Sequence, residues 1–551
     1  MDGEGCIYLT GKPGPGDFPV TSEEYSSNSI YVTKFNAEGS ALEYSTMIGG
    51  NSYDEVFALD VDKDGYAYIT GRTGSEDFPL TKDAYDTIQE DWEGFVTKLD
   101  QTGSALIYST FLGGVSRDYS EAIAVDKFGN AYVTGTTQSS LDFPLTEGAY
   151  DTVFDVVEPG FVTKINPSGN TLIYSTLIDN CNPVAITVDA SGCVYITGHT
   201  GSLEFPVTPG SYNYEENSAL TDNIYADAFV TKLNVDGSDL IYSTMFGGRD
   251  EPVSDHGRDY AYDIAVDSEG CAYITGKAQS SDFPTSPGAY STTYNGGSSD
   301  AFVSKLNADG RNLIYSTFFG GKEGTERSMS IIIDDLGRAV IAGYSDAYNV
   351  PTTKNALFPQ KIGGRDNFIA MFNRDGRSLA YASYFGGTEG EEWAYLGHDR
   401  HRNIYLAGET SSWDFPITEN SYDDSIYVFQ PTQPGAYSYA NYDVFVCKFT
   451  VTEITEVYDN DNAPVSFFLY PPHPNPFNPV TTLRYNLSES AEVTLSVYNV
   501  RGQKVATLVA EYQSPGEHHA VFDATGLASG IYFVRGTFDD KQSVKKVVFM
   551  K

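Results

Sequence analysis

The chain has 551 residues, of which 75 are Asp or Glu and only 34 are Lys or Arg, so its formal net charge is −41. A surface of this sign repels phosphate backbones and anionic lipid, and we therefore expect no nucleic-acid partner and no docking to an acidic membrane. The acidic, Tyr-rich and Gly-rich composition suits a secreted protein that meets sugars, cations or cell walls; the simpler alternative is that the charge only keeps the surface soluble.

The chain begins within a repeated unit. Residues 1–11, MDGEGCIYLTG, correspond to residues 266–276, VDSEGCAYITG, in the middle of a later copy. No signal peptide and no stretch of about 18 apolar residues is present, so we expect no transmembrane helix and a true start upstream of this sequence. The five cysteines are odd in number and sit in equivalent or distant places, which predicts free thiols.

One complete copy shows the repeated unit. It contains four short runs rich in Val, Ile, Tyr and Thr, at Ala122–Asp126, Asn130–Gly135, Gly160–Ile165 and Leu172–Thr176. Each run is bounded by Gly, Asn or Asp, which predicts four antiparallel strands. The Gly that closes the second run occurs in seven copies, at Gly11, Gly71, Gly135, Gly198, Gly276, Gly343 and Gly408. Seven such units predict an all-β protein with a seven-bladed β-propeller over residues 1–450.

The links between the runs are of two kinds. Tight Asp/Asn-x-x-Gly turns join runs one and two and runs three and four, whereas longer and more variable links follow runs two and four. Since antiparallel strands alternate in direction, the tight turns lie on one face of the disc and the long links on the other. The long-link face is therefore where we expect a ligand.

The phrases DFPLTKDAYDT, GFVTKLDQTGSALIYSTFLGG and AIAVDKFGNAYVTGTT resemble the bacterial β-propeller repeat known as the SBBP repeat. The resemblance covers residues 1 to about 450. It implies that the run like AIAVD is the innermost strand of each blade and the run like LIYST the outermost. Because the first copy starts at its second run, we expect the first blade to lack its inner strand.

After the last copy, residues 451–468 form an acidic linker. Period-2 runs from Thr481 to Lys551 predict a small β-sandwich of the immunoglobulin or fibronectin III kind. Residues 469–551 resemble the type A sorting domain of the type IX secretion system, through PNPFNP, VYNVRG, LASGIY and KKVVFMK. The resemblance implies the type IX machinery as a partner, a secreted or outer-membrane surface location, and a signal peptide that this sequence lacks. Its motif residues are Pro474, Asn475, Pro476, Phe477, Asn478, Pro479, Gly530, Tyr532, Lys545 and Lys546.

Five carboxylates share one position of the repeat, eight residues before the Asp that ends the inner strand. They are Asp54, Asp118, Asp259, Glu326 and Glu391, and Cys181 takes their place in the fourth copy. We expect them to ring the central opening on the long-link face, where they could hold a cation or a basic or sugar ligand. The alternative is that each accepts hydrogen bonds from a neighbouring blade.

The residue after the closing Gly of run two changes its chemistry from copy to copy. It is Lys12, Arg72, Thr136, His199, Lys277, Tyr344 or Glu409. A variable position on the long-link face is where a binding surface would be encoded, and we expect Arg72, His199, Lys277 and Glu409 to bind the ligand. Ordinary surface variation is the alternative.

In the second copy, Asp60, Asp62 and Asp64 have the D-x-D-x-D-G spacing of calcium-binding loops, although no Glu follows at the twelfth position. A plain turn is the alternative, and apart from Ca²⁺ at this loop we expect no cofactor. No G-x-S-x-G, H-E-x-x-H or P-loop motif is present, so the sequence indicates no catalytic residue.

These features favour an exported, monomeric propeller without enzymatic activity, which binds a glycan or a surface protein through its long-link face. The second hypothesis is an extracellular polysaccharide hydrolase or lyase, because propeller enzymes can assemble their carboxylates from several blades without a linear motif. Inserts at residues 201–227, 249–260 and 414–443 concentrate Tyr, Asp and Arg and motivate this hypothesis.

Overall fold

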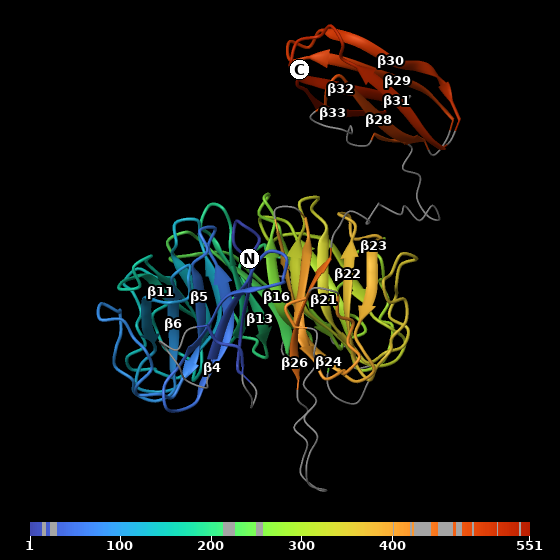
Figure 1. Cartoon of the computed structure of the whole chain (residues 1–551). Coiled ribbons are helices and arrows are strands. Elements are labelled where there is room, and N and C mark those ends of the chain that lie inside the picture. The colour runs from blue at the N-terminus through green and yellow to red at the C-terminus, as the bar shows by residue number, and fades with distance from the viewer. Residues whose placement is uncertain are drawn as a thin grey trace. The chain divides into compact units, whose positions relative to one another are not determined.

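The computed structural model divides into two compact units, Met1–Glu456 and Val457–Lys551 (Figure 1). The boundary between them falls inside the predicted linker. The structure describes residues 1–13, 18–21, 30–212, 226–248, 257–399, 402–418, 421–423, 442–449, 467–469, 477–487, 490–514, 516–538 and 541–551. The regular elements in these residues are all β-strands, and no helix there could cross a membrane.

The first unit contains seven consecutive antiparallel sheets in its described residues, one for each copy of the repeat, and we call them blades one to seven. Blade one has β1 (Ile7–Gly11), β2 (Ile30–Phe35) and β3 (Leu42–Ile48). Blade two has β4 (Asp54–Val61), β5 (Ala67–Thr73), β6 (Glu93–Leu99) and β7 (Leu106–Leu112). Blade three has β8 (Asp118–Val125), β9 (Ala131–Thr137), β10 (Gly160–Ile165) and β11 (Leu172–Ile178).

The remaining blades follow the same order. Blade four has β12 (Asn182–Val188), β13 (Val194–Thr200), β14 (Asp227–Leu233) and β15 (Leu240–Phe246). Blade five has β16 (Tyr260–Val266), β17 (Ala272–Ala278), β18 (Asp300–Leu306) and β19 (Leu313–Phe319). Blade six has β20 (Glu326–Ile333), β21 (Ala339–Ser345), β22 (Asp366–Phe372) and β23 (Leu379–Phe385). Blade seven has the described strands β24 (Glu391–His398), β25 (Ile404–Thr410) and β26 (Asp443–Phe449).

Neighbouring blades pack in chain order and the last blade returns to the first. The inner strands β4, β8, β12, β16, β20 and β24 contact one another in this sequence. At most boundaries, a Tyr amide in the link after the second strand donates to a Gly carbonyl in the last turn of the next blade. The pairs are Tyr85 with Gly169, Tyr150 with Gly237, Tyr212 with Gly310, Tyr290 with Gly376 and, between blades seven and one, Tyr422 with Gly39. The last pair closes the ring of a β-propeller.

The tight-turn side carries the same three side chains in most blades. In blade two, Asp62 accepts a hydrogen bond from the Tyr68 hydroxyl (3.2 Å), and the Lys98 ammonium lies 3.9 Å from Asp62 and 4.6 Å from the Tyr68 ring centroid. The Tyr68 hydroxyl also contacts the Gly129 carbonyl of blade three (3.4 Å). The other sets are Asp2–Tyr8–Lys34, Asp126–Tyr132–Lys164, Asp189–Tyr195–Lys232, Asp267–Tyr273–Lys305 and Asp399–Tyr405–Lys448. These constant residues join turn to strand and stabilise the fold.

Each described inner strand also contains a β-bulge opposite the closing Gly of the next strand. The extra residue of the bulge is Phe57, Glu121, Val184, Tyr262, Met329 or Trp393. The bulged backbone lies very close to the glycine, since a Cβ at Gly135 would lie 1.8 Å from the Tyr119 carbonyl oxygen. The Gly that marks the repeat in the sequence is therefore required because no side chain fits there.

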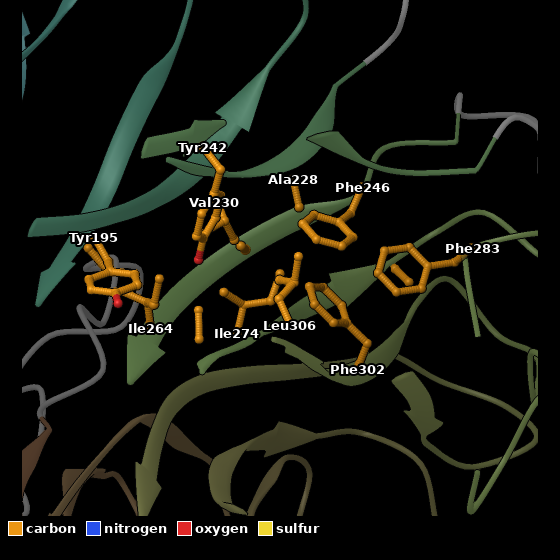
Figure 2. Close-up of a cluster of buried hydrophobic side chains, with 14 of the residues drawn as sticks. Tyr195, Ala228, Val230, Tyr242, Phe246, Ile264, Ile274, Phe283, Phe302 and Leu306 are labelled. Carbon is orange, nitrogen blue, oxygen red and sulfur yellow. The ribbon is translucent and has the colours of Figure 1, made fainter. Parts of the chain in front are cut away.

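Apolar side chains fill the space between adjacent blades. Between blades four and five, Val230, Phe246, Ile264, Phe302 and Leu306 are all at most 4% exposed and belong to one cluster (Figure 2). Full burial of such a side chain contributes about 1.5–3 kcal/mol. The apolar residues of the predicted strands thus supply the core between these blades.

The second unit is built from two sheets around one core. One sheet has the order β27 (Phe467–Leu469), β28 (Val480–Leu487) and β31 (Gly516–Asp523). The other has the order β30 (Lys504–Gln513), β29 (Ala491–Asn499), β32 (Gly530–Phe538) and β33 (Lys541–Phe549). Leu483 and Phe522 of the first sheet and Leu495, Val534 and Val547 of the second share this core, so the unit is a β-sandwich.

We predict that Gly135→Ala destabilises the propeller strongly, because the new Cβ would overlap the Tyr119 carbonyl. The free energy of unfolding should fall by about 1–3 kcal/mol or more, measured by urea denaturation of the full chain. Gly74→Ala is the matched control, since its nearest neighbour would be at 3.5 Å, and it should change stability by less than about 0.5 kcal/mol. Equal unfolding midpoints for the two variants would contradict the role of the bulge.

Candidate functional site

At the long-link end of the inner strands, paired side chains form what we call the inner rim. The residue after each predicted carboxylate position lies opposite the residue after the closing Gly. The pairs are Glu55 with Arg72, Tyr119 with Thr136, Asn182 with His199, Tyr260 with Lys277, Arg327 with Tyr344 and Glu392 with Glu409. All four predicted binding residues therefore lie on the inner rim, on four different blades.

Arg72 lies between blades two and three. Its guanidinium pairs with Glu55 (2.7 Å) and lies 5.2 Å from the Trp92 ring and 5.0 Å from the Tyr119 ring. Burial raises the pKa of Glu121 to about 7, although Arg72 acts in the opposite direction. This sector thus combines a paired cation, aromatic rings and a carboxyl group that titrates near neutral pH.

His199 and Lys277 meet around one aromatic ring between blades four and five. The centroid of the Tyr260 ring lies 4.5 Å from that of His199 and 4.5 Å from the Lys277 ammonium. Burial, and then the Lys277 charge, lower the pKa of His199 to about 4, so the imidazole is neutral at pH 7. The structure thus brings together two of the four predicted binding residues.

The rim continues through blades six and seven. The guanidinium groups of Arg327 and Arg365 lie 5.9 and 4.9 Å from the Tyr344 ring, and Arg365 forms an ion pair with Glu392. Glu409 lies opposite Glu392, and burial followed by this like charge raise its pKa. Glu409 therefore belongs to an acidic end of the rim, separate from Arg72.

The five predicted carboxylates are buried, so the expectation that they ring an opening is corrected. Asp54, Asp118, Asp259, Glu326 and Glu391 are each 0% exposed. Each accepts a hydrogen bond from the second glycine amide of the link that leads into its blade. The donors are Gly50 (2.7 Å), Gly114 (2.8 Å), Gly248 (2.8 Å), Gly321 (3.2 Å) and Gly387 (3.2 Å). These contacts support the structural alternative.

One of these carboxylates faces a second buried acid across a blade boundary. A Cβ at Gly113 would lie 2.2 Å from Glu93 Oε2 and 2.5 Å from Asp118 Oδ2, so the two carboxyl groups flank this glycine. Glu93 Oε2 has no hydrogen-bond partner in the described part of the chain. A second pair, Asp300 and Glu326, flanks Gly320 in the same way, at 2.3 and 2.7 Å. We call these the acid pairs.

The acid pairs hold protons at neutral pH. Burial is the main cause that raises the pKa of Glu93 to about 9, of Asp118 to about 6, of Asp300 to about 7 and of Glu326 to about 8. The other charged groups near them are also acids, namely Asp86 and Glu90 beside Glu93, Asp142 beside Asp118 and Asp346 beside Glu326. Each pair therefore titrates as a unit and retains about one proton at pH 7.

The boundary between blades three and four lacks an acid pair. Pro159 and Cys181 occupy its two positions, and Asp179 and Asn180 replace the two glycines of the link. The Cys181 thiol donates to the Ile178 carbonyl (3.3 Å) and, as predicted for all five cysteines, is free. At this boundary the two glycines and the two acids are replaced together.

The predicted calcium loop does not bring its carboxylates together. Asp60 accepts the Val61 amide (2.7 Å) and the Val125 amide of blade three (2.8 Å). Asp62 contacts Tyr68, and Asp64 pairs with the neighbouring lysine at the surface. Among the described residues, no three His, Cys, Asp or Glu side chains are placed to hold a metal. The geometry therefore does not support calcium binding by these three residues.

The described sorting-motif residues hold the second unit together. Phe477 is 3% exposed, its ring lies 5.5 Å from that of Phe522 and 5.3 Å from that of Phe549, and its amide donates to the Val548 carbonyl (3.0 Å). The Tyr532 hydroxyl donates to the Ala528 carbonyl (2.8 Å). Asn478 precedes Pro479, whose carbonyl accepts the Ala524 amide, while Gly530 starts β32 and Lys545 and Lys546 lie in β33. Pro474, Asn475 and Pro476 lie outside the described residues.

The inner-strand half of the rim was not predicted from the sequence. Glu55, Tyr119, Tyr260, Arg327 and Glu392 each follow a predicted carboxylate position directly, and they vary as strongly as their cross-strand partners. Comparison of that neighbouring position across the copies would have found them. The contacts between blades, such as that of His199 with Tyr260, had no signal in the sequence.

Two family models match parts of the chain. Residues 43–79, 107–142 and 241–284 match the β-propeller repeat, and residues 472–550 match the secretion system C-terminal sorting domain. The chain is thus a repeat protein of the β-propeller class. It carries a type IX sorting domain, which marks it for export and attachment at the cell surface. No curated protein matches the chain.

Similar solved structures include three with low identity. PorZ, a bacterial surface component of the type IX secretion system of Porphyromonas gingivalis, is 12% identical with a TM-score of 0.29, over 95% of this chain and 64% of PorZ. A Dyadobacter fermentans protein of unknown function is 11% identical (TM-score 0.34, 67% and 94% covered). A PL25 ulvan lyase is 11% identical (TM-score 0.36, 73% and 87% covered). With TM-scores this low, these likenesses say nothing about the function of this chain.

From the acid pairs, we predict that the stability of the folded protein falls as the pH rises. Because the folded-state pKa values are raised, the folded protein binds more protons, and this stabilisation is complete below the unfolded pKa of about 4 and lost up to about pH 9. In Glu93→Gln, the free energy of unfolding should change less with pH than in the wild type, by about 1–3 kcal/mol between these limits. Urea denaturation at several pH values measures this difference. Glu76 is an exposed acid, so Glu76→Gln should leave the pH dependence of the stability unchanged. A Glu93→Gln curve parallel to that of the wild type would refute the pair.

Proposed function

We propose that this protein is a monomeric surface protein without enzymatic activity that binds a glycan at the inner rim. The contrast between the two faces carries the proposal. The tight-turn side repeats one Asp–Tyr–Lys set in six blades, whereas the inner rim has a different pair of side chains in every described blade from two to seven. Residues that stabilise the fold are constant, so the varied rim is free to recognise a ligand.

The chemistry of the rim suits a sugar. Tyr119, Tyr260 and Tyr344 offer aromatic faces beside charged groups, and Trp393 and Tyr395 of blade seven are 44% and 52% exposed. Aromatic rings stack on the apolar faces of sugar rings, while nearby charged and amide groups fix the hydroxyl groups by hydrogen bonds. Export by the sorting domain places this surface where extracellular glycans occur.

We predict that the full-length chain binds members of a glycan array and that Arg72→Gln, His199→Gln and Lys277→Gln each weaken this binding on the order of tenfold. Arg311 lies in the turn between β18 and β19 on the opposite face, so the Arg311→Gln variant should bind glycans like the wild type. A pull-down with cell-surface extract tests for a protein ligand instead. Glycan binding that none of the three rim variants changes would rule out the rim.

One observation favours the second function, a polysaccharide lyase or hydrolase. Glu121 has a pKa near 7 and lies close to Arg72 and Tyr119. A carboxyl group that titrates near the working pH can act as a general acid or base, and an adjacent guanidinium can neutralise a substrate carboxylate.

For this second function, we predict release of reducing ends, or of unsaturated products with ultraviolet absorbance, from a panel of polysaccharides. Glu121→Gln should lower the rate by about 100-fold or more, because it removes the proton-transfer group while keeping the shape. Wild-type protein that releases no product from any polysaccharide would leave binding as the function of the rim.

A further inference from the structure

We infer that the ligand of the inner rim is an anionic polysaccharide and that Arg327 of blade six binds its carboxylate or sulfate groups. This inference rests on the proposed function and adds the chemical class of the ligand.

Arg327 differs from the other arginines of the rim because no described carboxylate neutralises it. Arg72 pairs with Glu55 and Arg365 pairs with Glu392. Arg327 forms no such ion pair within the described ranges, and its buried Nε has no hydrogen-bond acceptor there. A guanidinium without a carboxylate partner lacks the charge-assisted hydrogen bonds that Arg72 and Arg365 make, so an anion supplied by a ligand would be favoured at this position.

Acidic side chains number 75 and Lys and Arg together only 34, so a basic side chain in this protein has many candidate partners. Four of the six tight-turn lysines have such partners: Lys34, Lys98, Lys232 and Lys305 each lie within 4 Å of a carboxylate. An arginine at the variable rim without a partner among the described carboxylates fits an anion from outside the chain.

The surroundings of Arg327 favour a sugar anion over a small inorganic ion. The rings of Tyr260 and Tyr262 are nearly parallel, with 6° between their planes and 6.3 Å between centroids. Lys277 lies over Tyr260, and the Arg327 charge acts on Tyr262 against the burial that raises the pKa of this phenol to about 12. An aromatic strip with a cation at each end matches a chain of sugar rings that carries repeated negative charges.

The guanidinium geometry also fits this class of ligand. A guanidinium presents a planar fork of N–H donors that pairs with two oxygens of a carboxylate or sulfate at once. Tyr344 lies opposite Arg327 in the sheet, with its ring 5.9 Å from the guanidinium, and limits the directions that this fork can take.

The test uses the full-length protein and two matched pairs of probes: dextran sulfate with dextran, and polygalacturonate with its methyl ester. We expect binding to at least one charged probe, weakened by added salt, and little binding to its uncharged counterpart. Arg327→Gln should weaken this binding at least about tenfold, Arg327→Lys should restore part of it, and Arg311→Gln should leave it unchanged. The charged probe that binds distinguishes a carboxylate from a sulfate ligand.

Equal binding of charged and uncharged probes, or wild-type binding by Arg327→Gln, would overturn the inference. If Arg327→Gln lowers the melting temperature, Lys277→Gln at the other end of the strip provides the same comparison. A protein that binds neutral glycans through Arg72 and His199 but ignores both polyanions would refute this inference and keep the proposed function. A protein that binds no glycan at all would refute both.

Discussion

In each described inner strand, one extra residue makes the backbone bulge against the closing glycine of the next strand. The gap is so small that a Cβ would lie only 1.8–2.4 Å from a backbone oxygen, as at Gly135 and Gly408. A bulge increases the local twist and changes the direction of the side chains around it. The carboxylate before it, such as Asp118, is buried against the link, while the next residue, Tyr119, reaches the rim. Asp118 and Tyr119 precede the bulge and are consecutive residues of one strand, so their side chains point to opposite faces. This alternation separates the residue that holds the ring from the one that can recognise a ligand.

Much of the fold could be predicted from the sequence because it repeats. The closing glycines and the Asp-x-x-Gly turns give the four strands of a blade, although the second strand extends two residues past Gly71, to Thr73. The roles of the carboxylates were not predictable in the same way. Their burial depends on glycines and hydroxyl groups from other segments, and the strand direction takes Asp60 away from Asp62 and toward Val125.

The position of the candidate site in the repeat could be predicted from the sequence. The contacts that its side chains make could not. Arg72, His199 and Lys277 could be found because one position of the repeat varies. That Tyr260 lies between His199 and Lys277 depends on how two blades pack, and the single-sequence pattern contains no measure of this distance. Arg327 was not predicted, because only Glu326 before it occupies a position where the copies share a carboxylate, and the lack of an ion-pair partner for Arg327 depends on the folded structure.

The junction between a Tyr amide and a Gly carbonyl is the same chemical contact at four described boundaries within the ring and at its closure, where Tyr422 meets Gly39. Both partners are backbone groups, so the contact does not depend on which side chains a blade displays at its rim. A gene rearrangement that exchanges, duplicates or deletes one blade would therefore recreate the same junction with the new neighbour. The recognition surface of such a protein can be recombined blade by blade, without a fresh solution to the problem of closing the ring.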